Sequence, residues 1–86
     1  MPKSNHHVGE NIKMFRKMRD LKQESLARKM GPGWTQEKIS ELERQADVTP
    51  DKLALVASAL NLPVAMLRYF GDPEFTDYAW NVWTPA

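Results

Sequence analysis

The 86-residue sequence contains no cysteine, and no apolar run in it approaches the length needed to cross a bilayer. The missing cysteines exclude disulfides, thiolate metal sites and a cysteine nucleophile, and they suit a reducing compartment. The missing apolar run excludes a membrane-spanning helix, and residues 1–7 lack the apolar stretch of a signal peptide. We therefore expect a cytoplasmic protein without a membrane partner.

Catalytic and metal-binding patterns are also absent. No set of serine, histidine and acidic residues has the spacing of a catalytic triad or of a metal site. The adjacent His6 and His7 have no cysteine to complete a metal site, which favours a flexible N-terminus over residues 1–7. We expect no enzymatic activity, no metal and no cofactor.

What the sequence does contain is an uneven distribution of charge. The net charge is +1, but residues 1–44 carry ten Lys and Arg against six acids, a balance of +4, whereas residues 45–86 carry two against five, a balance of −3. This difference predicts that one end of the molecule attracts polyanions. The alternative interpretation is that the charges only solvate helix surfaces.

Apolar residues recur at helical spacing, with short breaks between the periodic segments. The pattern predicts helices over residues 8–19, 23–30, 36–44 and 63–70. A further helix begins at Thr49 and Pro50, an N-cap followed by a first-turn proline, and buries an apolar face up to Leu60. The sequence thus predicts an all-α, five-helix domain over residues 8–70, followed by a short aromatic C-terminal tail over residues 71–86.

The segment 36–44 has two chemically different sides. At about 100° per residue, Ile39 and Leu42 share the side that faces the core. The opposite side displays Glu37, Ser40, Glu41 and Arg44, with Gln36 and Lys38 at its amino end and Thr35 as N-cap. Gln pairs with adenine, carboxylates accept from cytosine, and Lys suits guanine or phosphate. Two short helices joined by a tight break predict a helix-turn-helix that enters the major groove, and an ordinary amphipathic surface helix is the alternative.

Glu43 lies on the core side of the same helix, beside Ile39 and Leu42. A lone carboxylate there is costly, so it needs a cation. Arg16 lies next to Phe15, near the inner face of the first helix. We expect a structural ion pair between Arg16 and Glu43 that ties the first helix to the third.

These residues resemble a known family, the Cro/CI-type phage repressor domains, also called the XRE family. The resemblance covers about residues 8–70 and rests on four runs of the sequence: Ile12 to Arg16, Leu21 to Ala27, Thr35 to Arg44 and Leu53 to Leu60. Its most specific element is Gln-x-x-Leu-Ala followed by Gln-x-x-Ile-Ser-x-x-Glu, with an Arg in the first helix. It implies a lambda-repressor-like fold, binding of double-stranded operator DNA by a nucleoid-associated homodimer, and transcriptional regulation, usually repression.

The resemblance also implies roles for individual residues. The base-reading positions correspond to Gln36, Glu37 and Glu41, with Lys38 and Ser40 beside them. Contacts to DNA phosphates fall to Lys22, Gln23, Thr35, Arg44 and Gln45, and Gln23 also braces the third helix. Arg16 and Glu43 match the family's internal ion pair.

The sequence departs from the family pattern in three places. The turn formed by residues 31–34 is about two residues longer than usual, which bears on the tilt of the recognition helix. Glu37 and Glu41 put acids where neutral or basic readers are common, so they would raise specificity and lower non-specific affinity. The loop 45–48 lacks basic residues, which predicts weak or salt-sensitive binding.

Remaining apolar residues support structural interpretations. Trp34 is expected to plug the core over the second and third helices rather than to contact DNA. Core filler is expected from Met14, Met18, Met30 and Met66. The tail carries Phe75, Tyr78, Trp80, Val82 and Trp83. This segment from Phe75 to Trp83 either covers the domain's own core or contacts a second copy or another protein.

Two other functions keep the same fold. In an antitoxin, the domain binds operator DNA while the tail engages a toxin. In a protein-interaction module, DNA binding is lost, and the acids of the third helix are the best support for that interpretation.

Overall fold

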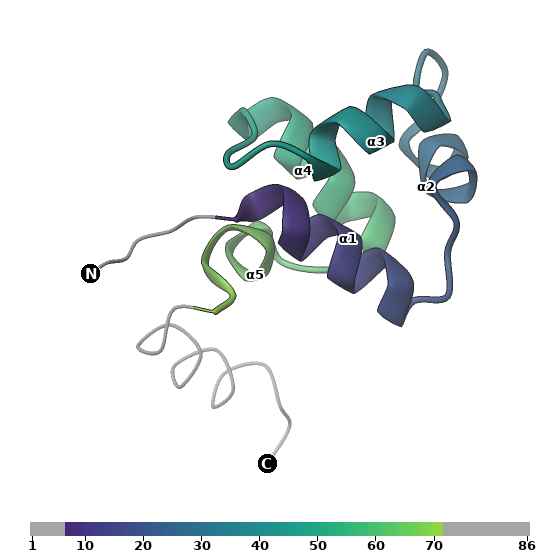
Figure 1. Ribbon diagram of the computed structural model, residues 1–86. Coiled ribbons are helices and arrows are strands. Elements are labelled where there is room, and N and C mark those ends of the chain that lie inside the picture. The colour runs from purple at the N-terminus through teal and green to yellow at the C-terminus, as the bar shows by residue number, and fades with distance from the viewer. Residues whose placement is uncertain (1–6, 72–86) are drawn as a thin grey trace.

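Five helices follow one another along residues 7–71, the part of the chain that the structure describes. In this computed structural model they are α1 (Val8–Met18), α2 (Gln23–Met30), α3 (Gln36–Glu43), α4 (Pro50–Leu60) and α5 (Val64–Tyr69) (Figure 1). No strand occurs among residues 7–71. The predicted all-α, five-helix architecture is confirmed, and the tail from Phe75 to Trp83 lies outside the described residues.

The predicted helix ends were wrong by one residue at several places. The first helix ends at Met18, and Arg19 is its C-cap because the next residue, Asp20, has φ +59°. Arg44 likewise is the C-cap of α3 rather than part of it. Pro63 and Phe70 have extended backbones and flank α5, so this helix is two residues shorter than predicted.

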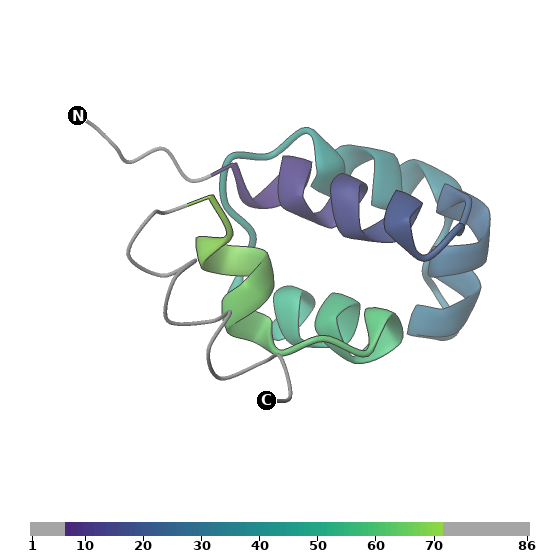
Figure 2. The ribbon, with the colours of Figure 1, turned by 90° about the horizontal axis from the view of Figure 1, so that it is seen from below.

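The helices surround one hydrophobic core. Viewed from below, α1 and α4 run along opposite sides of the domain, with α2 at one end and α5 at the other (Figure 2). Helix α3 packs against α1 and α2. The largest fully buried side chains come from all five helices: Val8, Ile12, Leu26, Ile39, Leu53, Val56, Leu60 and Leu67. The apolar residues at helical spacing are therefore the ones that are buried here.

The methionines divide between core and surface. Met30 is buried, and Met14 and Met66 are half-buried against the core. Met18 is 70% exposed, so its prediction as core filler was wrong. It lies about 120° around α1 from Ile12, which places it beyond the buried stripe of this helix.

The amino end of α1 is joined to the carboxyl end of α3. The amide of Val8 donates to the carbonyl of Ala46, and that of Gly9 donates to the carbonyl of Gln45, each at 3.0 Å. A Cβ on Gly9 would lie 2.5 Å from the carbonyl oxygens of Leu42 and Gln45. Only a glycine permits this approach, which fixes where α3 ends.

A second junction holds α5 on α1. The side-chain amide of Asn11 donates to the carbonyls of Leu67, at 2.9 Å, and Phe70, at 3.2 Å. The rings of Phe15 and Phe70 meet edge to face, with their centroids 5.2 Å apart. The carbonyl of Leu67, in the last turn of α5, thereby gains a partner from α1, and the end of α5 is anchored there.

Candidate nucleic-acid interface

Arg16 and Glu43 meet inside the domain and tie α1 to α3. The Arg16 Nε lies 2.6 Å from Oε2 of Glu43, and its Nη2 donates to Oε1 at 3.3 Å. Both side chains are buried, with 8% and 4% of their surfaces exposed. The remaining guanidinium nitrogen, Nη1, donates to the carbonyl of Leu21 at 2.7 Å. The guanidinium therefore also holds the segment that leads into α2.

Gln23, the first residue of α2, extends this network toward the surface. Its Nε2 donates to Oε1 of Glu43 at 3.0 Å. Its Oε1 accepts from Nε2 of Gln36 at 3.5 Å, a long and therefore weak hydrogen bond. These contacts correspond to the bracing of the third helix expected of Gln23. They also orient the side chain of Gln36 at the start of α3.

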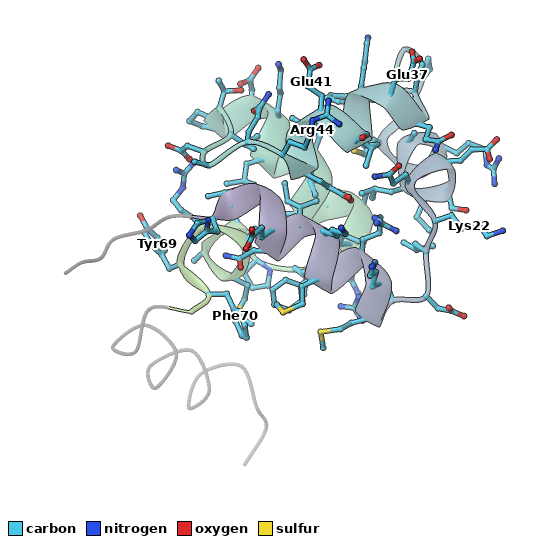
Figure 3. The ribbon with its side chains drawn as sticks, viewed as in Figure 1. Lys22, Glu37, Glu41, Arg44, Tyr69 and Phe70 are labelled. Carbon is cyan, nitrogen blue, oxygen red and sulfur yellow. The ribbon has the colours of Figure 1, made fainter. Side chains whose placement is uncertain are left out.

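The outer side of α3 carries polar and charged side chains. Exposed residues there are Gln36, Glu37, Lys38, Glu41 and Arg44, while Ser40 is half-buried. Glu37 and Glu41 project away from the body of the domain (Figure 3). Arg44 reaches back one turn, and its Nη1 donates to the hydroxyl of Ser40 at 2.9 Å.

Thr35 caps the amino end of α3 as expected. Its Oγ1 accepts a hydrogen bond from the amide of Lys38 at 3.2 Å. This bond satisfies one of the amides that the first turn of a helix leaves without a partner. The cap fixes where α3 begins, so the positions of Gln36 and Glu37 are set by the local sequence.

Lys38 points toward the turn between α2 and α3. Its Nζ donates to the carbonyl of Gly33 at 2.7 Å and lies 5.9 Å from the centroid of the Trp34 ring. Trp34 itself is half-buried and packs against the core. Trp34 therefore covers the core in part, as expected, and the rest of its side chain is exposed.

Other residues expected at a DNA backbone are placed at the edges of this surface. Lys22 is the N-cap of α2, and Arg44 and Gln45 follow the last turn of α3; all three are exposed. In Figure 3, Arg44 lies next to Glu41, whereas Lys22 lies at the start of α2, away from both labelled acids. The outer side of α3 therefore carries two exposed acids with Arg44 as a neighbouring cation.

Within residues 7–71, no three histidine, cysteine or acidic side chains gather where they could hold a metal ion. None of the helices in this part of the chain combines the length and the apolar character that crossing a bilayer requires.

A comparison with protein-family models matches residues 12–67 to the helix-turn-helix family. The chain belongs to that family. Searches of curated proteins and of solved structures gave no match. The matched span runs from Ile12, in the second turn of α1, to the core residue Leu67 of α5, and it includes every side chain of the surface described above.

Membership of the helix-turn-helix family gives the class of the domain. The chain is a DNA-binding domain of the XRE, or Cro/CI, type, a non-catalytic class. The helix-turn-helix unit comprises α2, the turn at residues 31–35 and α3. In this motif the second helix lies in the major groove and the first crosses the backbone.

Three residues that position this helix-turn-helix were not recognised from the sequence. Gly9 and Asn11 fix α1 to α3 and α5, and Arg19 donates from Nε to the carbonyl of Leu60 at 2.9 Å. Gly9 gave one local signal, because glycine is a poor helix former and its presence in a helix indicates a close approach. Asn11 and Arg19 gave none, since their partners lie more than 40 residues away in the sequence.

Proposed function

We propose that the protein is a sequence-specific transcriptional regulator that reads duplex DNA with the outer side of α3. The observation that supports this proposal best is that the acids of α3 differ in burial. Glu43 is buried on Arg16, whereas Glu37 and Glu41 project into solvent. Both exposed acids stand on one side of a helix whose first turn is capped by Thr35, where they are free to meet a partner.

Base reading falls to Gln36, Glu37, Ser40 and Glu41. Gln36 suits adenine, because its amide both donates and accepts, and the carboxylates suit the amino group of cytosine. Acids near phosphates are repelled unless they find such a donor, so these residues disfavour non-specific binding. Lys38 was predicted beside them, but its ammonium donates to the carbonyl of Gly33 in the turn before α3.

Contacts to the DNA backbone fall to Lys22, Gln23, Thr35, Arg44 and Gln45. Lys22, Thr35, Arg44 and Gln45 are exposed at the ends of α2 and α3. With two cations in this set, affinity depends on few phosphate contacts and falls with rising salt. Binding that relies on so few cations favours a regulator that acts on a defined operator, as a repressor does, over a general coating protein.

A homodimer is the proposed binding unit. A shallow, mainly apolar groove lies between the loop after α3 and helix α5. Its apolar lining comes from Val48, Pro50, Val64 and Tyr69, and the Asp47–Arg68 ion pair and Thr49 also line it. Val64 and Tyr69 remain 38% and 41% exposed. The loop at this groove continues directly from α3, and we propose a two-fold arrangement in which the two recognition helices lie on the same side of the dimer. Half-sites about 34 Å apart on one side of the duplex match that arrangement.

The experiment that tests the function is selection of tight binders from random duplexes with the purified protein. We expect enrichment of one sequence, and we expect the double substitution Gln36→Ala with Glu41→Ala to remove the preference while helical circular dichroism persists. Glu10→Ala with Lys13→Ala, on the exposed side of α1, is the matched control and should retain the preference. If the double variant of α3 selects the same sequence as the unchanged protein, the base-reading assignment is wrong.

A further inference from the structure

The two glycines of the turn between α2 and α3 lie away from the rest of the domain. Gly31 and Gly33 adopt φ values of +117° and +90°, and a Cβ at either position would meet no atom within 4 Å. Glycine is therefore needed at both places for its backbone conformation and not for space. The backbone bonds of the turn are long, with Gly31 donating to Ala27 and Trp34 donating to Gly31, each at 3.3 Å.

Lys38 supplies the short contact that this turn otherwise lacks. Its ammonium donates to the carbonyl of Gly33 at 2.7 Å and lies over the Trp34 ring, while its own amide donates to Thr35. Lys38 thus contacts three consecutive residues ahead of α3, and Trp34 packs in turn against the core. The result is a connection from the first turn of α3, through the turn, to the interior.

We propose that Lys38 is a positioning residue, which fastens the long turn to α3 and thereby sets the angle at which α3 leaves it. This proposal rests on the proposed function, since the angle matters for how α3 enters the groove. In this role Lys38 contributes neither a base contact nor a phosphate contact.

Helix electrostatics support this role. A cation in the first turn of a helix is disfavoured by the partial positive charge at that end. The Gly33 carbonyl and the negative face of the Trp34 ring offset that cost. Because the ammonium of Lys38 lies at the turn, it does not cover Glu37 and Glu41, which face solvent on the outer side of α3. The hydrogen bond to the Gly33 carbonyl is charge-assisted and holds one of the three N–H donors of the ammonium at the turn.

The first test concerns the free protein and needs no DNA. Lys38→Met keeps the length of the side chain over Trp34 but removes the donor to Gly33. We expect the amide order parameters of Gly33 and Trp34, measured by ¹⁵N relaxation, to fall from about 0.85 to about 0.6. Lys22→Met, the matched control, should leave both values unchanged. Unchanged order parameters in Lys38→Met would overturn the proposal.

The second test separates positioning from direct contact on DNA. Loss of one hydrogen bond predicts about a 3- to 10-fold weaker affinity of Lys38→Met for the selected duplex, with the slope of log K against log salt unchanged. Lys22→Met should reduce the magnitude of that slope by about 0.9, the value for one lost phosphate contact. A similar reduction in Lys38→Met would show a phosphate contact and overturn the proposal, as would loss of preference at a single base pair or unchanged affinity. If the unchanged protein binds no duplex, the proposed function fails, while the relaxation measurement still decides whether Lys38 fastens the turn.

Discussion

Arg16 and Glu43, 27 residues apart in the sequence, form two hydrogen bonds with each other in the interior of the domain. Both charges have left water, and their attraction offsets much of that cost without a large net gain in stability. The pair fixes the orientation of α3 relative to α1. Because Gln23 also donates to Glu43, α2 is included in the same arrangement.

Removal of the arginine should destabilise the protein strongly. In Arg16→Met, Glu43 stays buried and keeps only Gln23 as a donor, so we expect a loss of about 3–5 kcal/mol in the free energy of unfolding. Urea denaturation followed by circular dichroism measures it. Arg28→Met is the control, since its ion pair with Glu24 is long, at 3.9 Å, and its side chain is 72% exposed; the expected change is within about 0.5 kcal/mol. The double substitution Arg16→Met with Glu43→Leu should recover most of the loss, and no recovery would mean that the unpaired carboxylate is not the cause.

Gly9→Ala should destabilise the protein, although alanine ordinarily stabilises a helix by up to about 1 kcal/mol over glycine. The added methyl group would lie 2.5–2.7 Å from three backbone carbonyl oxygens at the end of α3. Backbone groups cannot move aside cheaply, so we expect a loss of about 1–3 kcal/mol, seen as a lower Tm. Lys13→Ala, at an exposed position of the same helix, should change the Tm little. A raised Tm in Gly9→Ala would contradict the close contact between α1 and α3.

Asp51, in the first turn of α4, should titrate abnormally because of Thr49. The Thr49 hydroxyl donates to the carboxylate and lowers the pKa of Asp51, with further lowering by the backbone amides of Asp51 and Lys52 and by the charge of Lys52. Thr49→Val should therefore raise this pKa toward its ordinary value, as measured by NMR titration of the carboxyl group. Thr35→Val changes the capping threonine of α3 instead and should leave the pKa of Asp51 unchanged.

The lowered pKa of Asp51 also predicts how the stability of the protein changes as the pH falls. A carboxyl whose pKa is lower in the folded state stabilises the protein above its unfolded-state pKa, about pH 4, and this contribution disappears as the pH falls through the folded-state value. We expect Asp51→Asn to lack this part of the pH dependence when unfolding is compared between about pH 6 and pH 2. Identical pH dependence in the two proteins would show that the Thr49 hydrogen bond does not form in solution.

A charge placed in the groove beside α5 should separate the proposed dimer. Val64 is the first residue of α5, where an acid is compatible with the helix dipole, so Val64→Asp should fold normally while it disfavours an apolar contact. Sedimentation should show a monomer for this variant and a dimer for the unchanged protein. Leu55→Asp adds the same charge at an exposed apolar residue of α4 outside the groove and should remain dimeric. A dimer of unchanged strength in Val64→Asp would place the interface elsewhere.

Much of this domain could be predicted from the sequence, because its signals are local. The helical spacing of Ile39 and Leu42 predicts which side of α3 is buried, and a carboxylate among them requires a cation, which is how Arg16 could be named. The contact that Lys38 makes is an example of an interaction that local sequence signals do not predict. Its position on the outer side was predictable, but the direction of a flexible four-carbon chain depends on where the Gly33 carbonyl points, and that follows from a positive φ. The contact of Gly9 likewise depends on the path of a loop more than 30 residues away.

The anchoring of α5 by Asn11 has a practical consequence for immobilisation. The carbonyl of Phe70 is held on α1, and Phe70, which precedes Gly71, lies on the side of the domain opposite to the outer side of α3 (Figures 1 and 3). A tether grafted at Gly71 would therefore leave the recognition helix unobstructed on a sensor chip. A tether grafted at the turn between α2 and α3 would crowd it.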